Sequence, residues 1–304
     1  MTTGGALWKE LDVISQDGTR IHVYVSGKAG KTLFLAPGLG GPIESWDGIA
    51  QAFCKEYQIV SWDARGTYKS EKPKDEENCL IPHHVMDMEA IAQALALEKV
   101  VVGGWSMGVE IAIEFTSRHK DWVSGLILIG GTYGRLLDSM LGVELPDKVI
   151  AMITSGLSAL GMPASLLLKT LLNNNPSVLR LLRSIGFVKH NESSFAVLAQ
   201  RFASLDFRYY FKLVRGLATH NSQALLPSIN VPTLVIAGEK DRITPLSVMQ
   251  EIANKIPSSR LVVLPEATHY AIVEYPEIVI SAVGAFLASL ERTSPRIAPI
   301  DLLR

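Results

Sequence analysis

Short apolar runs alternate with stretches of helical periodicity in the first and last thirds of the chain. The runs are rich in β-branched residues and end at turn residues, which is typical of buried strands. They predict eight strands, at residues 7–14, 20–26, 32–36, 57–62, 99–103, 122–129, 232–238 and 260–264. Helical spacing predicts helices at 44–53, 84–97, 109–115, from 245 onward and at 276–290. This alternation predicts an α/β fold in which helices cover both faces of a mostly parallel sheet. The first two strands, joined at Asp17-Gly18, are expected to form a hairpin.

Residues 132–227 have a different pattern, because leucine-rich segments of helical spacing replace the alternation. We expect an α/β core made of residues 1–131 and 228–304, with residues 132–227 inserted as a helical cap. The predicted cap helices are 136–141, 149–160, 165–172, 178–185 and 195–205, separated by Pro146, Pro163 and Pro176. The tail from Glu291 to Arg304 contains two prolines and is expected to be irregular.

The central junction between a strand and a helix has the sequence Gly104-Trp105-Ser106-Met107-Gly108. Apolar residues at helical spacing follow it, and Glu110 and Glu114 fall on the opposite face of that helix. Glycines two residues to either side of Ser106 let the chain turn sharply without Cβ clashes. Such a turn exposes the serine hydroxyl at the carboxyl end of a strand, which is the geometry of a nucleophile elbow.

A serine hydroxyl is a poor nucleophile until a base takes its proton, so Ser106 needs a base and an acid that orients it. His269 follows the last predicted strand, and Asp241 follows the strand before it. Because the carboxyl ends of parallel strands meet at one edge of a sheet, we expect the three side chains to lie together. Glu239 is the alternative acid.

Five stretches together resemble the α/β-hydrolase family: Pro37 to Gly41, Asp63 to Gly66, Gly104 to Gly108, and the turns that carry Asp241 and His269. The chain order Ser106, Asp241, His269 is the order that this family uses. The resemblance implies an esterase-like or lipase-like serine hydrolase with an α/β-hydrolase sheet and a helical cap.

The resemblance also implies an oxyanion hole formed by the backbone amides of Leu39 and Met107. Pro37 stands where many relatives have histidine, but the donors are backbone groups and do not need that side chain. The turn Asp63-Ala64-Arg65-Gly66 resembles a structural turn of the family that braces loops near the site. Tyr68 stands where a glycine is common in that turn.

Composition excludes several other classes of protein. Hydrophobic residues make up 48% of the chain, charged residues 19%, and the net charge is -1, so no basic surface for nucleic acid is expected. No apolar run approaches the roughly 18 residues of a membrane span. Cys54 and Cys79 are too few for a disulfide framework, and Met1 to Gly5 lacks the features of a secretory signal, so a cytoplasmic protein is expected.

We expect no metal and no cofactor. His83 and His84 open a predicted helix and are expected to be solvated or to cap it. The remaining histidines lack partners at metal-ligand spacing; they are His22, His119, His190 and His220.

A serine nucleophile, rather than an aspartate, argues against dehalogenase and epoxide hydrolase chemistry. The chain is expected to be a carboxylesterase-like serine hydrolase acting on esters of small to medium, mainly apolar acyl groups. Thioesterase, lactonase, carbon–carbon bond hydrolase and perhydrolase chemistry use the same residues, and so does a small-molecule receptor on this fold. The cap helices carry more leucines than one buried stripe requires. These leucines are expected to face the core domain, a second copy in a homodimer or the substrate pocket, or to pack within the cap; they are Leu166, Leu167, Leu168, Leu171, Leu172, Leu179, Leu181 and Leu182.

Overall fold

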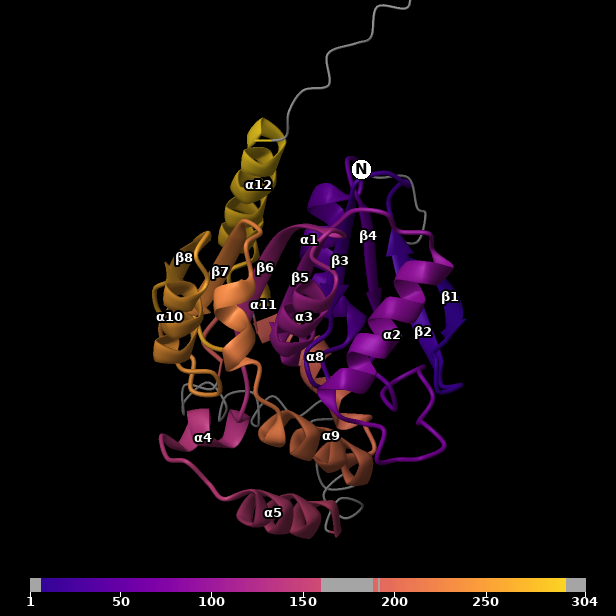
Figure 1. Ribbon diagram of the computed structural model, residues 1–304, viewed down its shortest axis with the longest axis vertical. Helices are drawn as coiled ribbons and strands as arrows, with labels where there is room; N and C mark the ends of the chain where they lie inside the picture. The colour runs from indigo at the N-terminus through magenta and orange to yellow at the C-terminus, as the bar shows by residue number, and fades with distance from the viewer. Residues whose placement is uncertain (1–6, 160–187, 191, 294–304) are drawn as a thin grey trace, which may run out of the picture.

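The computed structural model describes residues 7–159, 188–190 and 192–293 (Figure 1). In sheet order its eight strands are β1 (Lys9–Ile14), β2 (Arg20–Ser26), β4 (Gln58–Trp62), β3 (Thr32–Ala36), β5 (Val100–Ser106), β6 (Val123–Gly131), β7 (Thr233–Gly238) and β8 (Ser259–Leu264). β2 pairs antiparallel with β1 and β4, and every other pair is parallel. The predicted mostly parallel, eight-stranded sheet is therefore confirmed.

Helices cover both faces of this sheet, as the alternation predicts (Figure 1). One face carries α2 (Ile81–Ala94), α3 (Met107–Arg118) and α10 (Leu246–Lys255); the other carries the 3-10 helix η1 (Ile43–Trp46), α1 (Asp47–Phe53), α11 (Ala271–Glu274) and α12 (Pro276–Thr293). Along β3, Phe34 packs toward the first set and Leu33 toward the second, because successive strand residues point to opposite faces. Among the helices that the structure describes, none is both long and apolar enough to cross a membrane.

Within the described residues between β6 and β7, the structure has four helices and a 3-10 helix: α4 (Leu136–Leu141), α5 (Asp147–Ala159), α8 (Glu192–Ala203), α9 (Phe207–Thr219) and η2 (Gln223–Ser228). α4, α5 and α9 lie beyond one end of the sheet in Figure 1. That end is the carboxyl end of the strands, because a Cβ on Gly66, which follows β4, would lie 2.0 Å from the ring of Tyr209 on α9. The division into a core and a cap of residues 132–227, and a dimer through that cap, stay predictions. The predicted helices 165–172 and 178–185 and all eight cap leucines lie outside the described residues.

Helix α9 was not predicted, because it is rich in aromatic residues and the cap helices were predicted from leucine-rich segments. Asp206 caps the start of this helix, because its side chain accepts hydrogen bonds from the amides of Arg208 at 2.9 Å and Tyr209 at 3.5 Å. This aspartate was a signal for the helix in the sequence. An aspartate that satisfies the free amides of the first turn is a standard helix start.

Glu110 is buried, so its predicted place on the polar face of α3 is wrong. Its side chain is 0% exposed, and neither carboxylate oxygen has a hydrogen-bond partner among the described residues. The prediction failed because α3 is covered by α2 and η2 as well as by the sheet, which leaves no open face at this turn. Burial raises the pKa of Glu110 well above its ordinary value, and nearby Glu114 adds to the rise.

His84 is also buried, so the expectation that it is solvated or capping is wrong. α2 begins at Ile81, three residues earlier than predicted, and the Arg65 guanidinium bonds to the carbonyls of Asn78 and His83 over its first turn. Burial lowers the pKa of His84 to about 3. His83 does cap the helix, because its Nδ1 accepts a hydrogen bond from the amide of Leu80 at 3.3 Å.

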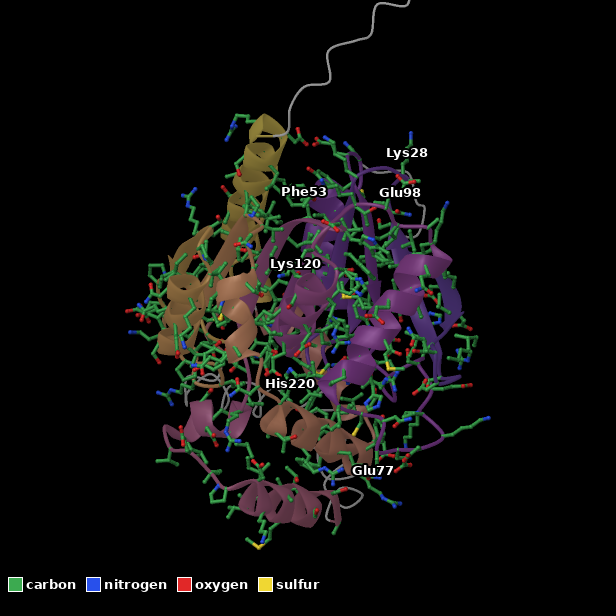
Figure 2. All side chains as sticks on the ribbon, in the orientation of Figure 1. Lys28, Phe53, Glu77, Glu98, Lys120 and His220 are labelled. Carbon is green, nitrogen blue, oxygen red and sulfur yellow. The ribbon has the colours of Figure 1, made fainter. Side chains whose placement is uncertain are left out.

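The segment that leaves β6 and the segment that returns to η2 pair with each other. Gly134 and Asn221 form an antiparallel bridge between them. His220, labelled at the end of α9 in Figure 2, places its Nε2 3.1 Å from a carboxylate oxygen of Glu114 on α3. The hydrogen bond from His220 lowers the pKa of Glu114. These contacts fix the end of α9 against α3, the helix that follows Ser106.

A buried arginine holds several surface segments to the core. The guanidinium of Arg65 is 0% exposed and makes hydrogen bonds of 2.8 and 2.5 Å to both carboxylate oxygens of Asp87 on α2. It also pairs with Asp17 at 2.8 Å, in the turn between β1 and β2. The Asp63-to-Gly66 turn thus has the bracing position that the resemblance implies.

We expect Arg65→Met to lower the free energy of unfolding by about 3–5 kcal/mol, since it leaves the carboxylate of Asp87 buried without a partner. The free energy is measured by urea unfolding. Lys31→Met is the control, because the pair of Lys31 and Glu291 is solvent-exposed, and its loss should cost much less. Equal losses in the two variants would contradict this account of Arg65.

Candidate active site

Ser106 ends β5 and directly precedes the first residue of α3. Its backbone has φ 57° and ψ -120°, a conformation that costs free energy for any residue with a Cβ. A Cβ on Gly104 would lie 2.0 Å from the carbonyl oxygen of Gly108, and a Cβ on Gly108 would lie 2.2 Å from that of Ala36. Both glycines are therefore required by the close approach of backbone to backbone, and the turn has the shape of the predicted elbow.

The structure brings Ser106, His269 and Asp241 into one hydrogen-bonded chain. The Ser106 hydroxyl oxygen lies 2.9 Å from Nε2 of His269, and Nδ1 of His269 lies 2.9 Å from Oδ2 of Asp241. Asp241 follows β7, and His269 follows β8. Ser106 and His269 are 163 residues apart along the chain, and Asp241 and His269 are 28 residues apart. Their side chains nevertheless meet at the carboxyl edge of the sheet.

Asp241 is held by four donors, which keep its carboxylate ionised and fixed in direction. The amides of Ile243 and Thr244 each donate to Oδ1 at 2.8 Å, and the Thr244 hydroxyl donates to Oδ2 at 2.7 Å. Burial alone would raise the pKa of Asp241, but His269 and the bonds from Thr244 outweigh it, and the pKa is lowered. Thr244 was not among the residues predicted for the site. The signal was present, because an aspartate followed three residues later by threonine and proline is typical of a turn that the aspartate side chain closes.

Glu239 does not contact the histidine. It is exposed, pairs with Lys240 at 3.3 Å and accepts a hydrogen bond from the amide of Glu266 at 3.1 Å. The geometry therefore favours Asp241, and not Glu239, as the acid that orients His269.

Trp105 positions His269 from the elbow itself. Its indole N–H donates to the backbone carbonyl of His269 at 3.1 Å, and the two rings lie 5.8 Å apart. Trp105 is 4% exposed, and its ring also contacts Tyr270 at 6.1 Å. The residue before the nucleophile thus anchors the loop that carries the base, a contact that sequence reasoning did not predict.

The turn Pro37 to Gly41 lies against the nucleophile. A Cβ on Gly38 would lie 3.3 Å from the Cβ of Ser106, so the backbone passes beside the serine. Leu39 follows this glycine, and Met107 is the first residue of α3. Neither amide donates a hydrogen bond to another group in the described part of the chain. As far as the described residues are concerned, both amides are therefore available to donate to an external oxygen.

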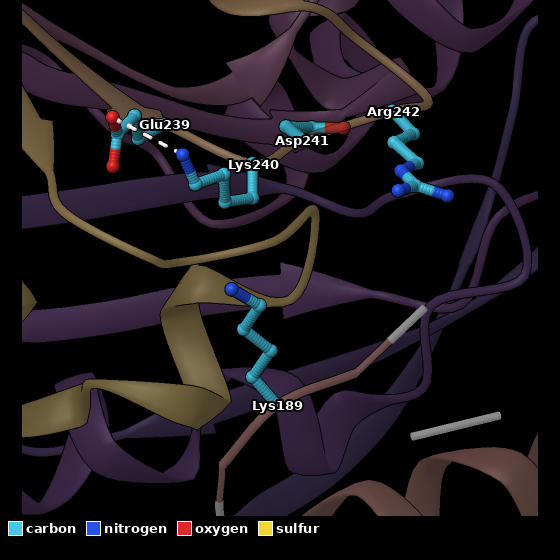
Figure 3. A pocket seen from close by; sticks show the side chains of 5 residues that line it. All are labelled: Lys189, Glu239, Lys240, Asp241 and Arg242. Atoms are coloured by element: carbon cyan, nitrogen blue, oxygen red, sulfur yellow. Dashed lines mark ion pairs between the residues drawn. The ribbon is translucent and has the colours of Figure 1, made fainter. Parts of the chain in front are cut away.

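A pocket of about 210 Å³ lies at the turn after β7 (Figure 3). The residues that line it are Lys189, Glu239, Lys240, Asp241 and Arg242. Lys189 reaches it from the segment before α8 and pairs with Glu266, while Lys240 pairs with Glu239. The charged lining makes this pocket unsuited to an apolar acyl chain.

The site can perform acid–base and nucleophilic chemistry with protein groups alone. Histidine can take a proton from the serine hydroxyl while the carboxylate stabilises the resulting imidazolium. No cluster of three or more potential metal ligands occurs in residues 7–159, 188–190 and 192–293.

Comparison with known proteins shows the family of the chain. The sequence model of the alpha/beta hydrolase fold family matches residues 31–276. The chain belongs to this family. The 2-hydroxymuconate semialdehyde hydrolase of Pseudomonas sp. (strain CF600) is 28% identical over 90% of this chain and 92% of its own. The α/β-hydrolase fold and the membership of a hydrolase family are thereby shown.

Solved structures show the same fold. A hydrolase from Pseudomonas aeruginosa PA01 superposes with a TM-score of 0.75 at 21% identity, covering 93% of this chain and 99% of its own. A thermophilic esterase from Thermogutta terrifontis superposes with a TM-score of 0.72 at 22% identity, with the same coverage of 93% and 99%.

Asp241→Asn should lower kcat by about 10⁴-fold while the fold is kept, because the amide favours the wrong tautomer of His269. Glu239→Gln is the matched control, and we expect kcat to change by less than about twofold, since its carboxylate does not touch the imidazole. The measurement is kcat on a p-nitrophenyl ester. The opposite ranking of the two variants would assign the acid to Glu239.

Proposed function

We propose that this chain is a serine hydrolase that cleaves carboxylic esters through an acyl-enzyme intermediate. The single observation that carries the proposal is the continuous hydrogen-bonded chain from the Ser106 hydroxyl through His269 to Asp241. A hydroxyl that already shares its proton with a base is activated at the moment it attacks.

In the first half-reaction the Ser106 oxygen attacks the ester carbonyl carbon, and Nε2 of His269 takes the hydroxyl proton. The carbonyl oxygen becomes negative and is held by the amides of Leu39 and Met107. The tetrahedral intermediate collapses, the bond to the alcohol oxygen breaks, and His269 gives its proton to the leaving alcohol. Asp241 stabilises the imidazolium throughout.

In the second half-reaction a water molecule attacks the acyl carbon, and His269 takes one of its protons. Collapse of the second tetrahedral intermediate breaks the bond to the Ser106 oxygen, which regains a proton from His269. The carboxylic acid leaves, and the enzyme returns to its starting state. The proposal invokes no metal and no cofactor.

Carbon–carbon bond hydrolysis is the second candidate, because the relative from Pseudomonas sp. (strain CF600) is named for the hydrolysis of 2-hydroxymuconate semialdehyde. The name of the Thermogutta terrifontis structure, an esterase, supports the first candidate. The same serine, histidine and aspartate serve both reactions, so the substrate decides between them.

Aromatic residues of the segment between β6 and β7 support an apolar substrate. Phe202 of α8 and Phe207, Tyr210 and Phe211 of α9 form one group of rings with centroid distances of 5.2 to 6.3 Å. Phe202 contacts Gly40, next to the proposed oxyanion donor Leu39. These rings would shield an apolar acyl group from water.

Ser106→Ala should abolish hydrolysis of p-nitrophenyl esters and leave the circular dichroism spectrum unchanged, since one hydroxyl contributes little packing. The measurement is kcat/KM for a panel of p-nitrophenyl esters with parent and variant. Hydrolysis by the variant at the parental rate would contradict the assignment. Faster turnover of 2-hydroxymuconate semialdehyde than of every ester would favour the second candidate.

The apolar surroundings predict a preference for medium acyl chains over acetate. Each buried methylene contributes about 0.8 kcal/mol, so two or three of them should improve binding about tenfold or more. We expect KM to fall from the acetate to about the hexanoate or octanoate in a series of p-nitrophenyl esters. An optimum at acetate would contradict it and would mean that the rings pack away from the substrate.

A further inference from the structure

The turn that carries the proposed oxyanion donor Leu39 is closed by a hydrogen bond across its own ends. The amide of Gly41 donates to the carbonyl of Gly38 at 3.0 Å. Between them, Gly40 has φ 66°, a conformation that glycine adopts without strain. Gly38 lies beside the nucleophile, because a Cβ on it would come within 3.3 Å of the Cβ of Ser106. The geometry of this small turn therefore decides where the Leu39 amide points.

A tyrosine side chain from another loop bonds to the backbone of this turn. The hydroxyl of Tyr68, in the segment after β4, donates to the carbonyl of Gly40 at 2.6 Å. Burial raises the pKa of Tyr68, so the hydroxyl stays protonated and able to donate at neutral pH. The backbone of Tyr68 has φ 45°, which costs free energy for a residue with a Cβ. Strained residues of this kind are concentrated at functional sites, which makes this contact a candidate for a function.

The ring of Tyr68 is held by a cation from α8. The guanidinium of Arg201 lies 5.1 Å from the ring centroid, and its Nε is 3.2 Å from a carboxylate oxygen of Glu44. Glu44 belongs to η1, which begins just after the turn of Leu39. A guanidinium over an aromatic face is attracted to it, which favours one orientation of the ring. Arg201 thus ties the ring of Tyr68 to the segment that follows the turn.

Two peptide groups connect the Tyr68 hydroxyl to the Leu39 amide. The Gly40 carbonyl and the Gly41 N–H belong to one planar peptide group. The Gly38 carbonyl and the Leu39 N–H belong to another, in which they point in opposite directions. A bond that fixes the Gly40 carbonyl therefore fixes the Gly41 N–H, and the bond from Gly41 to Gly38 then fixes the direction of the Leu39 N–H. Hydrogen bonds in such a chain also polarise one another, which makes the last N–H a stronger donor.

We propose that Tyr68 is a positioning residue that directs the Leu39 N–H toward the oxyanion formed when Ser106 attacks an ester. This inference rests on the proposed function and adds to it a residue that does not touch the substrate. The carbonyl oxygen of a bound ester carries little charge, so a well-directed donor stabilises the transition state more than the bound substrate. The contribution of Tyr68 therefore belongs to kcat rather than to KM.

Tyr133 provides a matched control away from this turn. Its hydroxyl donates to a carboxylate oxygen of Glu251 on α10 at 2.7 Å, and the ammonium of Lys255 lies 5.9 Å from its ring centroid. Both tyrosines are half-buried. Tyr133→Phe and Tyr68→Phe therefore each remove one phenol hydrogen bond and leave a ring beside a cation. Of the two bonds, only that of Tyr68 ends on the turn of Leu39.

The experiment measures kcat and KM for p-nitrophenyl hexanoate in the parent protein and in both variants. Tyr68→Phe should lower kcat about tenfold and change KM by less than about twofold. The fall is smaller than the 10²- to 10³-fold or so that follows the removal of an oxyanion donor, because the Leu39 amide stays but is less well directed. Tyr133→Phe should keep both parental values within about twofold.

Inhibition by an alkyl trifluoromethyl ketone reports on the oxyanion itself. The Ser106 oxygen adds to the ketone carbon, His269 takes the hydroxyl proton, and the ketone oxygen becomes the oxyanion. The inhibition constant should rise about tenfold in Tyr68→Phe and stay the same in Tyr133→Phe. The pH dependence of kcat/KM should be unchanged in both variants, because His269 keeps its contacts with Ser106 and Asp241.

The outcomes separate this inference from the proposed function. Failure of the parent protein to hydrolyse the ester would overturn the proposed function, whereas an unchanged kcat in Tyr68→Phe would overturn the positioning role alone. An equal fall in Tyr133→Phe, a fall in kcat without a rise in the inhibition constant, or a shifted pH profile would also overturn that role, since each places the effect outside the turn. Loss of the folded state in Tyr68→Phe, seen by circular dichroism, would show that the hydroxyl is structural and would overturn it too.

Discussion

The close approach of β5 to the first turn of α3 is the constraint on which the site depends. The backbone of Gly104 packs against that of Gly108, which in turn packs against Ala36 of β3. No side chain fits between these three segments, so the helix starts directly on the sheet. Ser106 is thereby held at φ 57° with its hydroxyl at the sheet edge. The strain is sustained because strands on both sides of β5 fix its position.

Everything else in the site is arranged around that fixed hydroxyl. Trp105 uses the same turn to hold the carbonyl of His269, and Thr244 fixes the direction of Asp241. These bonds orient the imidazole through its neighbours on two separate loops. A base that is oriented in advance needs little rearrangement when the serine proton moves, which is how preorganisation lowers a barrier.

The features that were predictable from sequence are those fixed by local chemistry. A β-branched run followed by glycine, serine and glycine indicates a nucleophile elbow, which gave the position of Ser106. A polar residue directly after a buried strand lies at the edge of the sheet, which gave the positions of Asp241 and His269. The burial of Glu110 and His84 did not, because it depends on which distant segments cover α3 and α2. The hydrogen bond from Trp105 to the carbonyl of His269 was not predicted for the same reason, since the two residues are 164 positions apart along the chain. Helix α9 was missed for another reason. Its capping residue, Asp206, is a local signal in the sequence, but the helix is rich in aromatic residues and lacks the leucine pattern used to predict the other helices of this segment.

The central claim is that Ser106 is a nucleophile activated by His269, and a covalent probe tests it most directly. The protein is incubated with a fluorophosphonate, and the site of modification is located by mass spectrometry of its peptides. The account predicts one adduct, on the peptide containing Ser106, that forms quickly in the parent and is strongly slowed in His269→Ala. The absence of an adduct on Ser106 under conditions that label a known serine hydrolase would contradict it, and so would labelling at the same rate without the histidine.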